Sequence, residues 1–403
     1  MTTDLMPAPA PARTAGAAPL TEESALAAIQ ECAELLEREA VRADRTATVP
    51  AASIAALREA GLWAAAVPVE YGGPGLGVEQ LTRIGSRLGG HCAATAMIWA
   101  MHQLQVACLA RSAAGSPAIA GYLAEAAREQ HLIASVTSEA GIGGNLRTSR
   151  AALVPDGGLV RLEKRATTVS YGPVADAFLI TARRGEQAAA SDQVLVLARR
   201  DQLELEQTGG WNTLGMRGTV SPPFVVRAAV PADQVLAEPF GTTATRCMVP
   251  LSHVLWAGVW TGVAGDAVRR AARFTRARAR AALGSGGTFA DERLGEVHAR
   301  LALLQGAVRS FAADYARWGG GADGEHTVTT RANALKTSVS VEASRIAEAA
   351  LEICGMAGYT EDGPYSVARH IRDLHSARLM IPNRQIDLAT TDLLLLGERA
   401  FQL

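Results

Sequence analysis

Hydrophobic residues in the first third of the chain recur at the three- and four-residue spacing of an α-helix. Thr21, a side chain typical of helix N-caps, is followed by two glutamates and then by apolar residues with this period. The same spacing predicts helices over residues 51–60 and 78–111. Residues 93–110 are apolar on every side of the predicted helix, so we expect that helix to lie in the centre of the protein.

The middle third has a different pattern, in which short apolar or alternating runs are separated by Gly, Pro, Asp and Asn. Such runs are typical of antiparallel β-strands, and they cover residues 132–136, 159–162, 178–182, 194–198 and 224–229. Beyond Pro231 the helical period returns. It predicts four long helices, over residues 254–282, 291–318, 327–354 and 384–403.

This order of elements predicts an α+β protein whose helices and strands are segregated. We expect a disordered tail, an N-terminal α-helical domain, a central antiparallel β-domain and a C-terminal α-helical domain, over residues 1–20, 21–131, 132–238 and 239–403. No G-x-G-x-x-G segment follows a predicted strand with the acidic residue that a Rossmann domain requires. An NAD enzyme is therefore disfavoured.

Composition narrows the class further. The formal net charge of -1 provides no bulk attraction to nucleic acid or to an anionic membrane. The five cysteines are scattered without a C-x-x-C pair, which argues against a structural zinc site and a disulfide framework. No apolar segment at the N-terminus has the length of a signal peptide, so we expect a cytoplasmic protein.

Four segments carry a resemblance to a known family. The first reads L-R-E-A-G-L-W-A-A-A-V-P-V-E-Y-G-G-P-G-L-G (57–77), and S-E-A-G-I-G-G-N (138–145) begins the β-region. T-T-V-S-Y-G-P-V-A-D-A-F (167–178) and W-N-T-L-G-M-R-G-T (211–219) follow. Together they resemble the acyl-CoA dehydrogenase superfamily along the chain from about Thr21. The resemblance implies that FAD is held between the β-domain and a C-terminal four-helix-bundle domain.

The resemblance also implies which residues hold the cofactor. Hydroxyls and backbone amides of the β-domain contact the flavin ring, where donors stabilise the negative charge of the reduced form; these residues are Thr137, Ser138, Gly143 and Ser170. A segment at residues 353–364 is similar to the loop that receives the FAD pyrophosphate, which implies roles for Gly355 and Gly358. Arg278 falls where family members place an arginine on the diphosphate, commonly of a neighbouring subunit, so a homodimer or homotetramer is implied.

The family's catalytic carboxylate has no evident counterpart. Members abstract the proton α to a thioester carbonyl with a glutamate while hydride passes to flavin N5, and most carry this glutamate just after an R-D-A segment. The matching stretch here is M-I-P-N-R-Q (380–385), and Asn383, which we place at the catalytic position, cannot accept a proton. The position that some members use instead holds Ser252, followed by His253.

Three explanations of this absence remain open. Another group, His253, His102 or Asp387, acts as the base, since a histidine pKa suits proton abstraction near neutral pH. Alternatively, the reaction needs no such base, as in superfamily members that use reduced flavin and oxygen as monooxygenases. In the third explanation the alignment is displaced, and Glu361 is the nearest carboxylate. A histidine such as His102 inside an apolar helix can also have a purely structural role, in which it bonds to a backbone carbonyl.

The first functional hypothesis is an FAD-dependent oxidoreductase acting on an acyl thioester, either acyl-CoA or an acyl-carrier protein, with a non-standard base. Its electrons pass to an electron-acceptor flavoprotein or to oxygen. The alternative is a flavin-dependent monooxygenase of the same fold, supplied with reduced flavin by a reductase. A third hypothesis is a non-catalytic subunit that only scaffolds partners. No metal, nucleic acid or membrane partner is expected.

Overall fold

The computed structural model describes residues 20–285 and 291–395, and its first part is helical. The helices are α1 (Glu22–Glu31), α2 (Ala33–Thr46), α3 (Ala51–Glu59), α4 (Val78–Gly89), α5 (Ala93–Ala113) and α6 (Pro117–Glu129). The predicted N-cap is present, because the Thr21 side chain accepts from the Ser24 backbone N–H at 3.1 Å. The single helix expected over residues 78–111 is two helices, α4 and α5. Cys92 begins the second, and its Sγ accepts from the Thr95 N–H at 3.4 Å.

The β-region forms two sheets. Their strands are β1 (Ile133–Val136), β2 (Val154–Asp156), β3 (Leu159–Ala166), β4 (Ala177–Arg183), β5 (Gln193–Arg199), β6 (Leu203–Gln207) and β7 (Phe224–Pro231). One sheet has the order β1-β4-β5 and the other β2-β3-β7-β6. The expectation of a wholly antiparallel domain was wrong in one pairing, because β1 and β4 are parallel with Ile133 opposite Ala177. The long segment between these strands, which contains β2 and β3, provides the crossover that parallel strands require.

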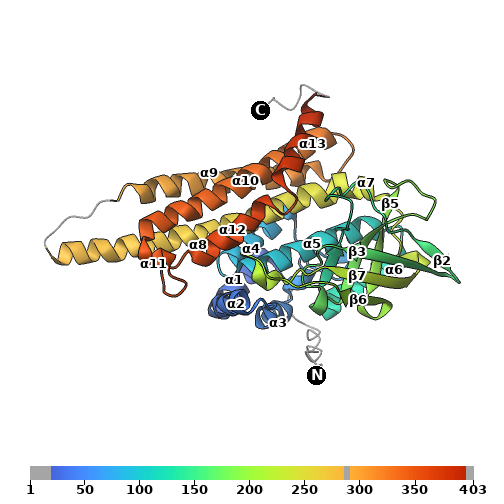
Figure 1. The fold of residues 1–403 in the computed structure, drawn as a ribbon, viewed down its shortest axis with the longest axis horizontal. Helices are drawn as coiled ribbons and strands as arrows, with labels where there is room; N and C mark the ends of the chain where they lie inside the picture. Colours follow the sequence, from blue (N-terminus) through green and yellow to red (C-terminus); the bar gives the residue numbers. More distant parts are fainter. Residues whose placement is uncertain (1–19, 286–290, 396–403) are drawn as a thin grey trace.

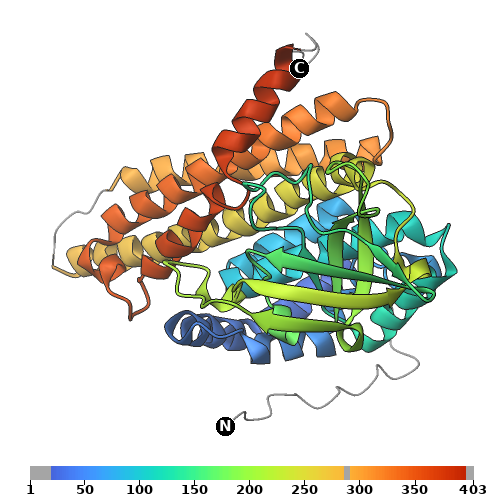
Figure 2. The same cartoon turned by 45° about the vertical axis from the view of Figure 1, so that its right-hand side comes forward.

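The last part of the chain is again helical. Its elements are α7 (Phe240–Thr243), a π-helical turn (Ala244–Met248), α8 (Val249–Gly284), α9 (Arg293–Trp318), α10 (Glu325–Cys354), α11 (Met356–Tyr359), α12 (Ala368–His375) and α13 (Asn383–Leu395). Figure 1 shows α8, α9 and α10 running side by side, with α13 projecting from this layer. In Figure 2 the two sheets lie in front of the helices at one end of the molecule.

Close approach of α4 and α8 joins the N-terminal helices to the C-terminal layer. A Cβ on Gly262 would lie 2.0 Å from the Ser86 carbonyl oxygen, and one on Gly89 would lie 2.4 Å from the Val259 carbonyl oxygen. Only glycine allows two helix backbones to pack this closely. The α+β fold class predicted from the sequence is confirmed, with helices, then strands, then a longer helical part.

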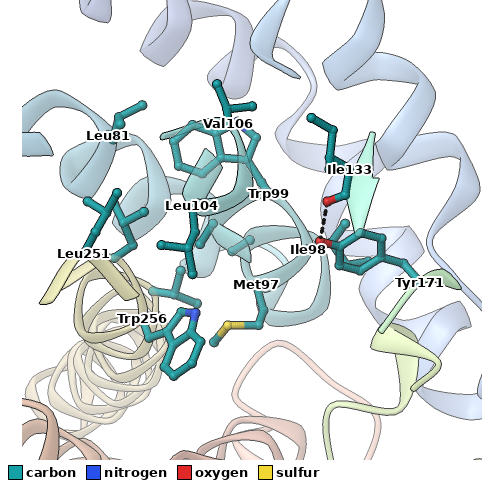
Figure 3. Close-up of a cluster of buried hydrophobic side chains, with 14 of the residues drawn as sticks. Leu81, Met97, Ile98, Trp99, Leu104, Val106, Ile133, Tyr171, Leu251 and Trp256 are labelled. Atoms are coloured by element: carbon teal, nitrogen blue, oxygen red, sulfur yellow. Dashed lines mark hydrogen bonds between the residues drawn. The ribbon is translucent and has the colours of Figure 1, made fainter. Parts of the chain in front are cut away.

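The central apolar helix predicted from the sequence is α5. Figure 3 shows Leu104 of α5 near Trp256 of α8, Trp99 of α5 farther from it, and Ile133 of β1 beside Tyr171. The Tyr171 hydroxyl donates to the Ile133 carbonyl at 3.0 Å, and this bond satisfies its polar atom within the core. Two helical stretches, Ala93–Ala113 and Phe240–Gly284, are long and apolar enough to cross a membrane, but 83% and 94% of their most apolar windows are buried inside the protein. They are core helices of this fold.

Candidate functional site

A cavity of about 550 Å³ lies where the β-region meets the C-terminal helices. One side, here called the β wall, presents hydroxyl side chains: Thr137, Ser138, Thr168, Ser170, Thr219 and Ser221. The opposite side, here called the helical wall, is mostly apolar and comes from α5, α8, α12 and the turn after α12. It includes Leu104, Val249, Trp256, Met380 and Ile381, together with Ser252, Arg372 and His375. None of the residues that line this cavity in the described parts of the chain is Asp or Glu.

The hydroxyls of the β wall form short hydrogen-bond chains. Ser138 Oγ donates to the Thr168 carbonyl at 2.8 Å and accepts from the Thr168 N–H at 3.0 Å. Ser221 Oγ donates to Ser170 Oγ at 2.8 Å, and Thr219 Oγ1 lies 3.1 Å from Ser221 Oγ. These bonds fix the hydroxyl positions before any ligand enters, and a site prepared in this way loses less entropy on binding.

The unsatisfied donors of the cavity fit a flat ring that carries several acceptors. Ser170 Oγ accepts from Ser221, and its own proton has no acceptor among the described residues. Trp211 Nε1 and Trp256 Nε1 are buried donors without a partner in the described structure, and both residues line the cavity. Buried donors normally find acceptors. The isoalloxazine ring of a flavin provides such acceptors on a planar, largely apolar body, so these residues suit it.

The motif at residues 211–219 joins the β wall to α12. A Cβ on Gly215 would lie 2.1 Å from the Arg372 carbonyl oxygen, so only glycine fits there. The next residue, Met216, donates its N–H to Asp373 Oδ1 at 2.6 Å. Burial raises the pKa of Asp373 to about 6. The Leu-Gly-Met-Arg sequence thus has a structural reason: it docks onto the helix that carries Arg372 and His375.

Arg372 is fixed by two carboxylates. Its guanidinium donates to both oxygens of Asp44 on α2, at 2.8 and 2.6 Å, and also lies 3.1 Å from Glu361. The Asp44 hydrogen bond is the main cause that raises the pKa of Arg372 above its ordinary value. Arg372 and His375 are the only ionisable side chains among the described residues of the cavity lining. His375 makes no hydrogen bond or ion pair within the described structure, which leaves its ring available to a ligand.

The turn after α12 contradicts the alignment that placed Asn383 at the catalytic position. Of the stretch 380–385, only Met380 and Ile381 line the cavity, and neither can accept a proton. Ile381 has φ 52°, a left-handed conformation that costs a β-branched residue about 1–2 kcal/mol. Because the chain turns there, Asn383 points away from the cavity, and its Oδ1 accepts from Lys336 Nζ at 2.7 Å.

His102 does not line the cavity, and both of its ring nitrogens are occupied. Nε2 lies 2.6 Å from the Trp63 carbonyl, and Nδ1 accepts from the Ile133 N–H at 2.9 Å, which fixes the neutral tautomer with the proton on Nε2. Burial lowers its pKa to about 4. Neither nitrogen is left for a substrate, so the geometry gives His102 the structural role of joining α5 to β1.

Ser252 lines the cavity, but its Oγ donates to the Val249 carbonyl at 2.7 Å within the same helix. The two further carboxylates considered as bases, Asp387 and Glu361, are exposed and lie outside the lining of the cavity. The sequence-predicted catalytic residues therefore do not come together at one point, since only Ser252 reaches this cavity.

His253 faces a second cavity of about 570 Å³. Burial lowers its pKa to about 3, and neither ring nitrogen makes a hydrogen bond among the described residues, although the Ala332 carbonyl lies close to the ring. The second cavity also has no Asp or Glu among its described lining residues. The two cavities share Leu146, Val249 and Ile381.

The residues implied in FAD binding separate into two groups. Thr137, Ser138 and Ser170 line the first cavity, whereas Gly143 does not, and its carbonyl accepts from Gln385, which lines the second cavity. The second group, Arg278, Gly355 and Gly358, lies outside the cavity lining. Arg278 follows Ser252 on α8 by about 40 Å along the helix axis, at 1.5 Å per residue, and its guanidinium stacks over Phe274 at 5.8 Å. Gly355 has φ 56° and ψ −139° at the end of α10, a conformation that glycine adopts readily.

Comparison with known proteins identifies the family. The family model of the acyl-CoA dehydrogenase N-terminal domain matches residues 22–130, and the model of the acyl-CoA dehydrogenase C-terminal domain matches residues 242–387. The chain belongs to the acyl-CoA dehydrogenase superfamily and is a flavin-dependent oxidoreductase of that family, which confirms the resemblance read from its motifs. Its relatives use FAD or FMN.

Individual relatives have different activities. The chain is 27% identical over 372 residues to L-evernosamine nitrososynthase of a Micromonospora species, covering 87% of this chain and 85% of that protein. It is 24% identical over 371 residues to cyclohex-1-ene-1-carbonyl-CoA dehydrogenase of Syntrophus aciditrophicus, covering 87% and 84%. Its fold matches the dibenzothiophene monooxygenase TdsC from Paenibacillus sp. A11-2, solved with FMN, with a TM-score of 0.81, 20% identity and coverage of 92% and 97%.

Several site residues escaped the sequence reasoning. His375 and Arg372 lie three positions apart on α12, so helical spacing places them on one face, and this signal was available in the sequence. Ser221 and Lys336 gave no comparable signal. Ser221 bonds to Ser170 and Lys336 bonds to the Ile381 carbonyl, and no local sequence pattern indicates either contact.

Proposed function

We propose that the protein is a flavin-dependent monooxygenase that transfers one atom of molecular oxygen to an uncharged, largely apolar substrate. The observation that carries this proposal is the absence of Asp and Glu from the lining of the cavity in the described chain. Dehydrogenation of an acyl thioester needs a base at the α-carbon, because that proton is only weakly acidic. Oxygenation of a nitrogen or sulfur atom needs no abstraction of a carbon-bound proton.

The reaction balances with the groups that this proposal names. Reduced flavin supplies two electrons, one atom of O₂ enters the substrate and the other leaves as water with two protons. A separate reductase provides the reduced flavin. His375 supports this reading because its ring lines the cavity and has no hydrogen-bond partner among the described residues, so it can bond to a bound ligand. The apolar helical wall, with Trp256 and Ile381, keeps water from the reacting atoms.

Cofactor binding is assigned to the β wall. Thr137, Ser138 and Ser170 would hold the flavin ring by hydrogen bonds, an arrangement that serves FMN and FAD equally because both carry the same ring. For FAD, the adenosine end would extend to Arg278, Gly355 and Gly358 of a neighbouring subunit, so that the cofactor lies across a homodimer or homotetramer interface. The separation of Arg278 from Ser252, about 40 Å along α8, supports a contribution in trans.

Relatives support the oxygenase proposal without deciding it. The nitrososynthase, by its name, forms a bond between nitrogen and oxygen, and TdsC is a monooxygenase of the same fold. The acyl-thioester dehydrogenase remains the second candidate, because another relative is a CoA-thioester dehydrogenase. His375 would then be the base, since its ring has no partner within the described residues.

The experiment separates these two reactions. The flavin-loaded protein is first mixed anaerobically with a panel of acyl-CoA and acyl-carrier thioesters, and we expect its oxidised flavin spectrum to stay unchanged. The flavin is then reduced by light and mixed with ¹⁸O₂ and a panel of arylamines and aryl sulfides. We expect a product that carries one ¹⁸O atom by mass spectrometry. Bleaching of the flavin by a thioester, with no labelled product, would overturn the proposal in favour of the dehydrogenase.

A further inference from the structure

The two cavities meet at a wall that comes from three different parts of the chain. Leu146 lies in the loop after β1, Val249 is the first residue of α8, and Ile381 lies in the turn between α12 and α13. Every other described residue that lines these two cavities lines only one of them. A ligand that extends from the first cavity into the second must therefore pass this wall.

Ile381 differs from the other two residues in its backbone. Its φ of 52° lies in the left-handed region, which a β-branched side chain adopts at a cost. Such a conformation persists only where the surrounding structure holds it. Ile381 therefore lies at the boundary of the two cavities in a conformation that its surroundings must hold.

The amine of a buried lysine holds the backbone of Ile381 in this conformation. Lys336 of α10 is fully buried, and its Nζ donates to the Ile381 carbonyl at 2.6 Å and to Asn383 Oδ1 at 2.7 Å. Asn383 in turn donates to Ser340 Oγ at 2.9 Å, one helical turn further along α10. Both ends of the three-residue turn are thus tied to one helix. Burial lowers the pKa of Lys336 to about 8, so its ammonium form, the stronger donor, still predominates at neutral pH.

We propose that Ile381 is the specificity-determining residue that limits the length of the substrate group in the first cavity. Lys336 is the positioning residue that holds Ile381 at the boundary of the two cavities. Removal of the Ile381 side chain joins the two cavities. The inference concerns the shape of the site, so it holds whether the reaction is an oxygenation or a dehydrogenation.

The test measures binding without turnover, which keeps it separate from the test of the proposed function. Isothermal titration calorimetry compares 4-methylaniline with 4-hexylaniline on the flavin-loaded protein. We expect Ile381→Ala to bind the hexyl compound at least tenfold more tightly than the wild type does, with the affinity for the methyl compound changed less than twofold. Ile381→Leu, which keeps the volume of the side chain, is the matched control and should retain the wild-type preference.

Variants of the anchor test the positioning role. Lys336→Met should raise the affinity for 4-hexylaniline in the same direction as Ile381→Ala, although the Ile381 side chain is intact. If that variant does not fold, Asn383→Leu removes one partner of the amine and should give the same change with smaller amplitude. Equal affinity of wild type and Ile381→Ala for 4-hexylaniline, or no binding to either, overturns the proposal. Unchanged selectivity in the folded anchor variants overturns the role of Lys336.

Discussion

The β wall and the helical wall of the first cavity are built in different ways. Hydroxyls of the β wall bond to partners within the β-region. Ser138 donates to the Thr168 carbonyl, 30 residues away in the sequence, and Ser221 donates to the Ser170 hydroxyl, 51 residues away. The helical wall is apolar, and its position depends on polar anchors outside the cavity. Arg372 reaches a partner 328 residues away in the sequence, and Met216 reaches one 157 residues away.

This difference separates two tasks. The β wall presents the hydroxyl donors that we propose as contacts of the flavin ring, and the chain belongs to a family of flavin-dependent oxidoreductases. The helical wall presents Met380 and Ile381, neither of which can accept a proton. Under the proposed function, cofactor binding and substrate chemistry reside on opposite walls, so one could change while the other is kept. Variants of each wall should accordingly have distinct effects.

The largest effect is expected from the remote anchor of the helical wall. Asp44→Ala removes both hydrogen bonds to the Asp44 carboxylate and leaves the partly buried guanidinium of Arg372 with the exposed Glu361 and the Leu214 carbonyl. Breaking a buried ion pair costs about 3–5 kcal/mol, and we expect about 3 kcal/mol because Arg372 keeps some solvent contact. Urea unfolding measures the change. Glu34→Ala, which removes a highly exposed pair with Arg38, is the control and should cost less than about 0.5 kcal/mol. A loss below about 1 kcal/mol for Asp44→Ala would contradict the anchoring role.

Of the residues singled out from the sequence, Thr137, Ser138 and Ser170 line the cavity whereas Asn383 does not, and the difference has a physical reason. Thr137, Ser138 and Ser170 lie in contiguous motifs, so local sequence is enough to place them in the cavity. The position of Asn383 depends on a left-handed turn at Ile381 that Lys336 holds from another helix. No periodicity of hydrophobic residues records such a contact.

The same reasoning explains the errors in the fold. Long helices and most strands follow from local periodicity, and the order of helices and strands was predicted correctly. The parallel pairing of β1 with β4 depends on the route of the chain between them. His102 was a candidate base because its sequence shows a polar residue in an apolar helix, whereas its two backbone partners at Trp63 and Ile133 come from other elements.

The second effect compares two buried histidines, His253 on α8 and His102 on α5. His253 has a folded-state pKa of about 3, below the ordinary 6.5, so the unfolded chain binds an extra proton as the pH falls through 6.5. The stability that neutral His253 contributes is present above pH 6.5 and is lost progressively toward pH 3. Between pH 7.5 and 5 this loss is about 2 kcal/mol.

Urea unfolding at these two pH values tests the assignment. His253→Phe should reduce the acid loss by about 2 kcal/mol and cost little at pH 7.5, because no hydrogen bond of the ring is removed among the described residues. His102→Leu should reduce the acid loss similarly, since its pKa is about 4. It should also cost about 2 kcal/mol or more at pH 7.5, because the Ile133 N–H loses its acceptor. Equal costs for both variants at pH 7.5 would contradict the difference between the two histidines.

The smallest effect is expected on the β wall, where each hydroxyl contributes one hydrogen bond among several. Ser170→Ala removes the hydroxyl that accepts from Ser221 and whose proton is left for the flavin ring. One such bond is worth about 1 kcal/mol, so flavin affinity should fall about fivefold, measured by fluorescence titration of the apoprotein with FMN and FAD. Ser112→Ala, which removes a buried hydroxyl of α5 that does not line the cavity, is the matched control. Unchanged affinity in Ser170→Ala would remove Ser170 from the flavin contacts. An equal decrease for FMN and FAD would place the interaction at the ring, because the ring is the part of the two cofactors that faces the β wall in this assignment.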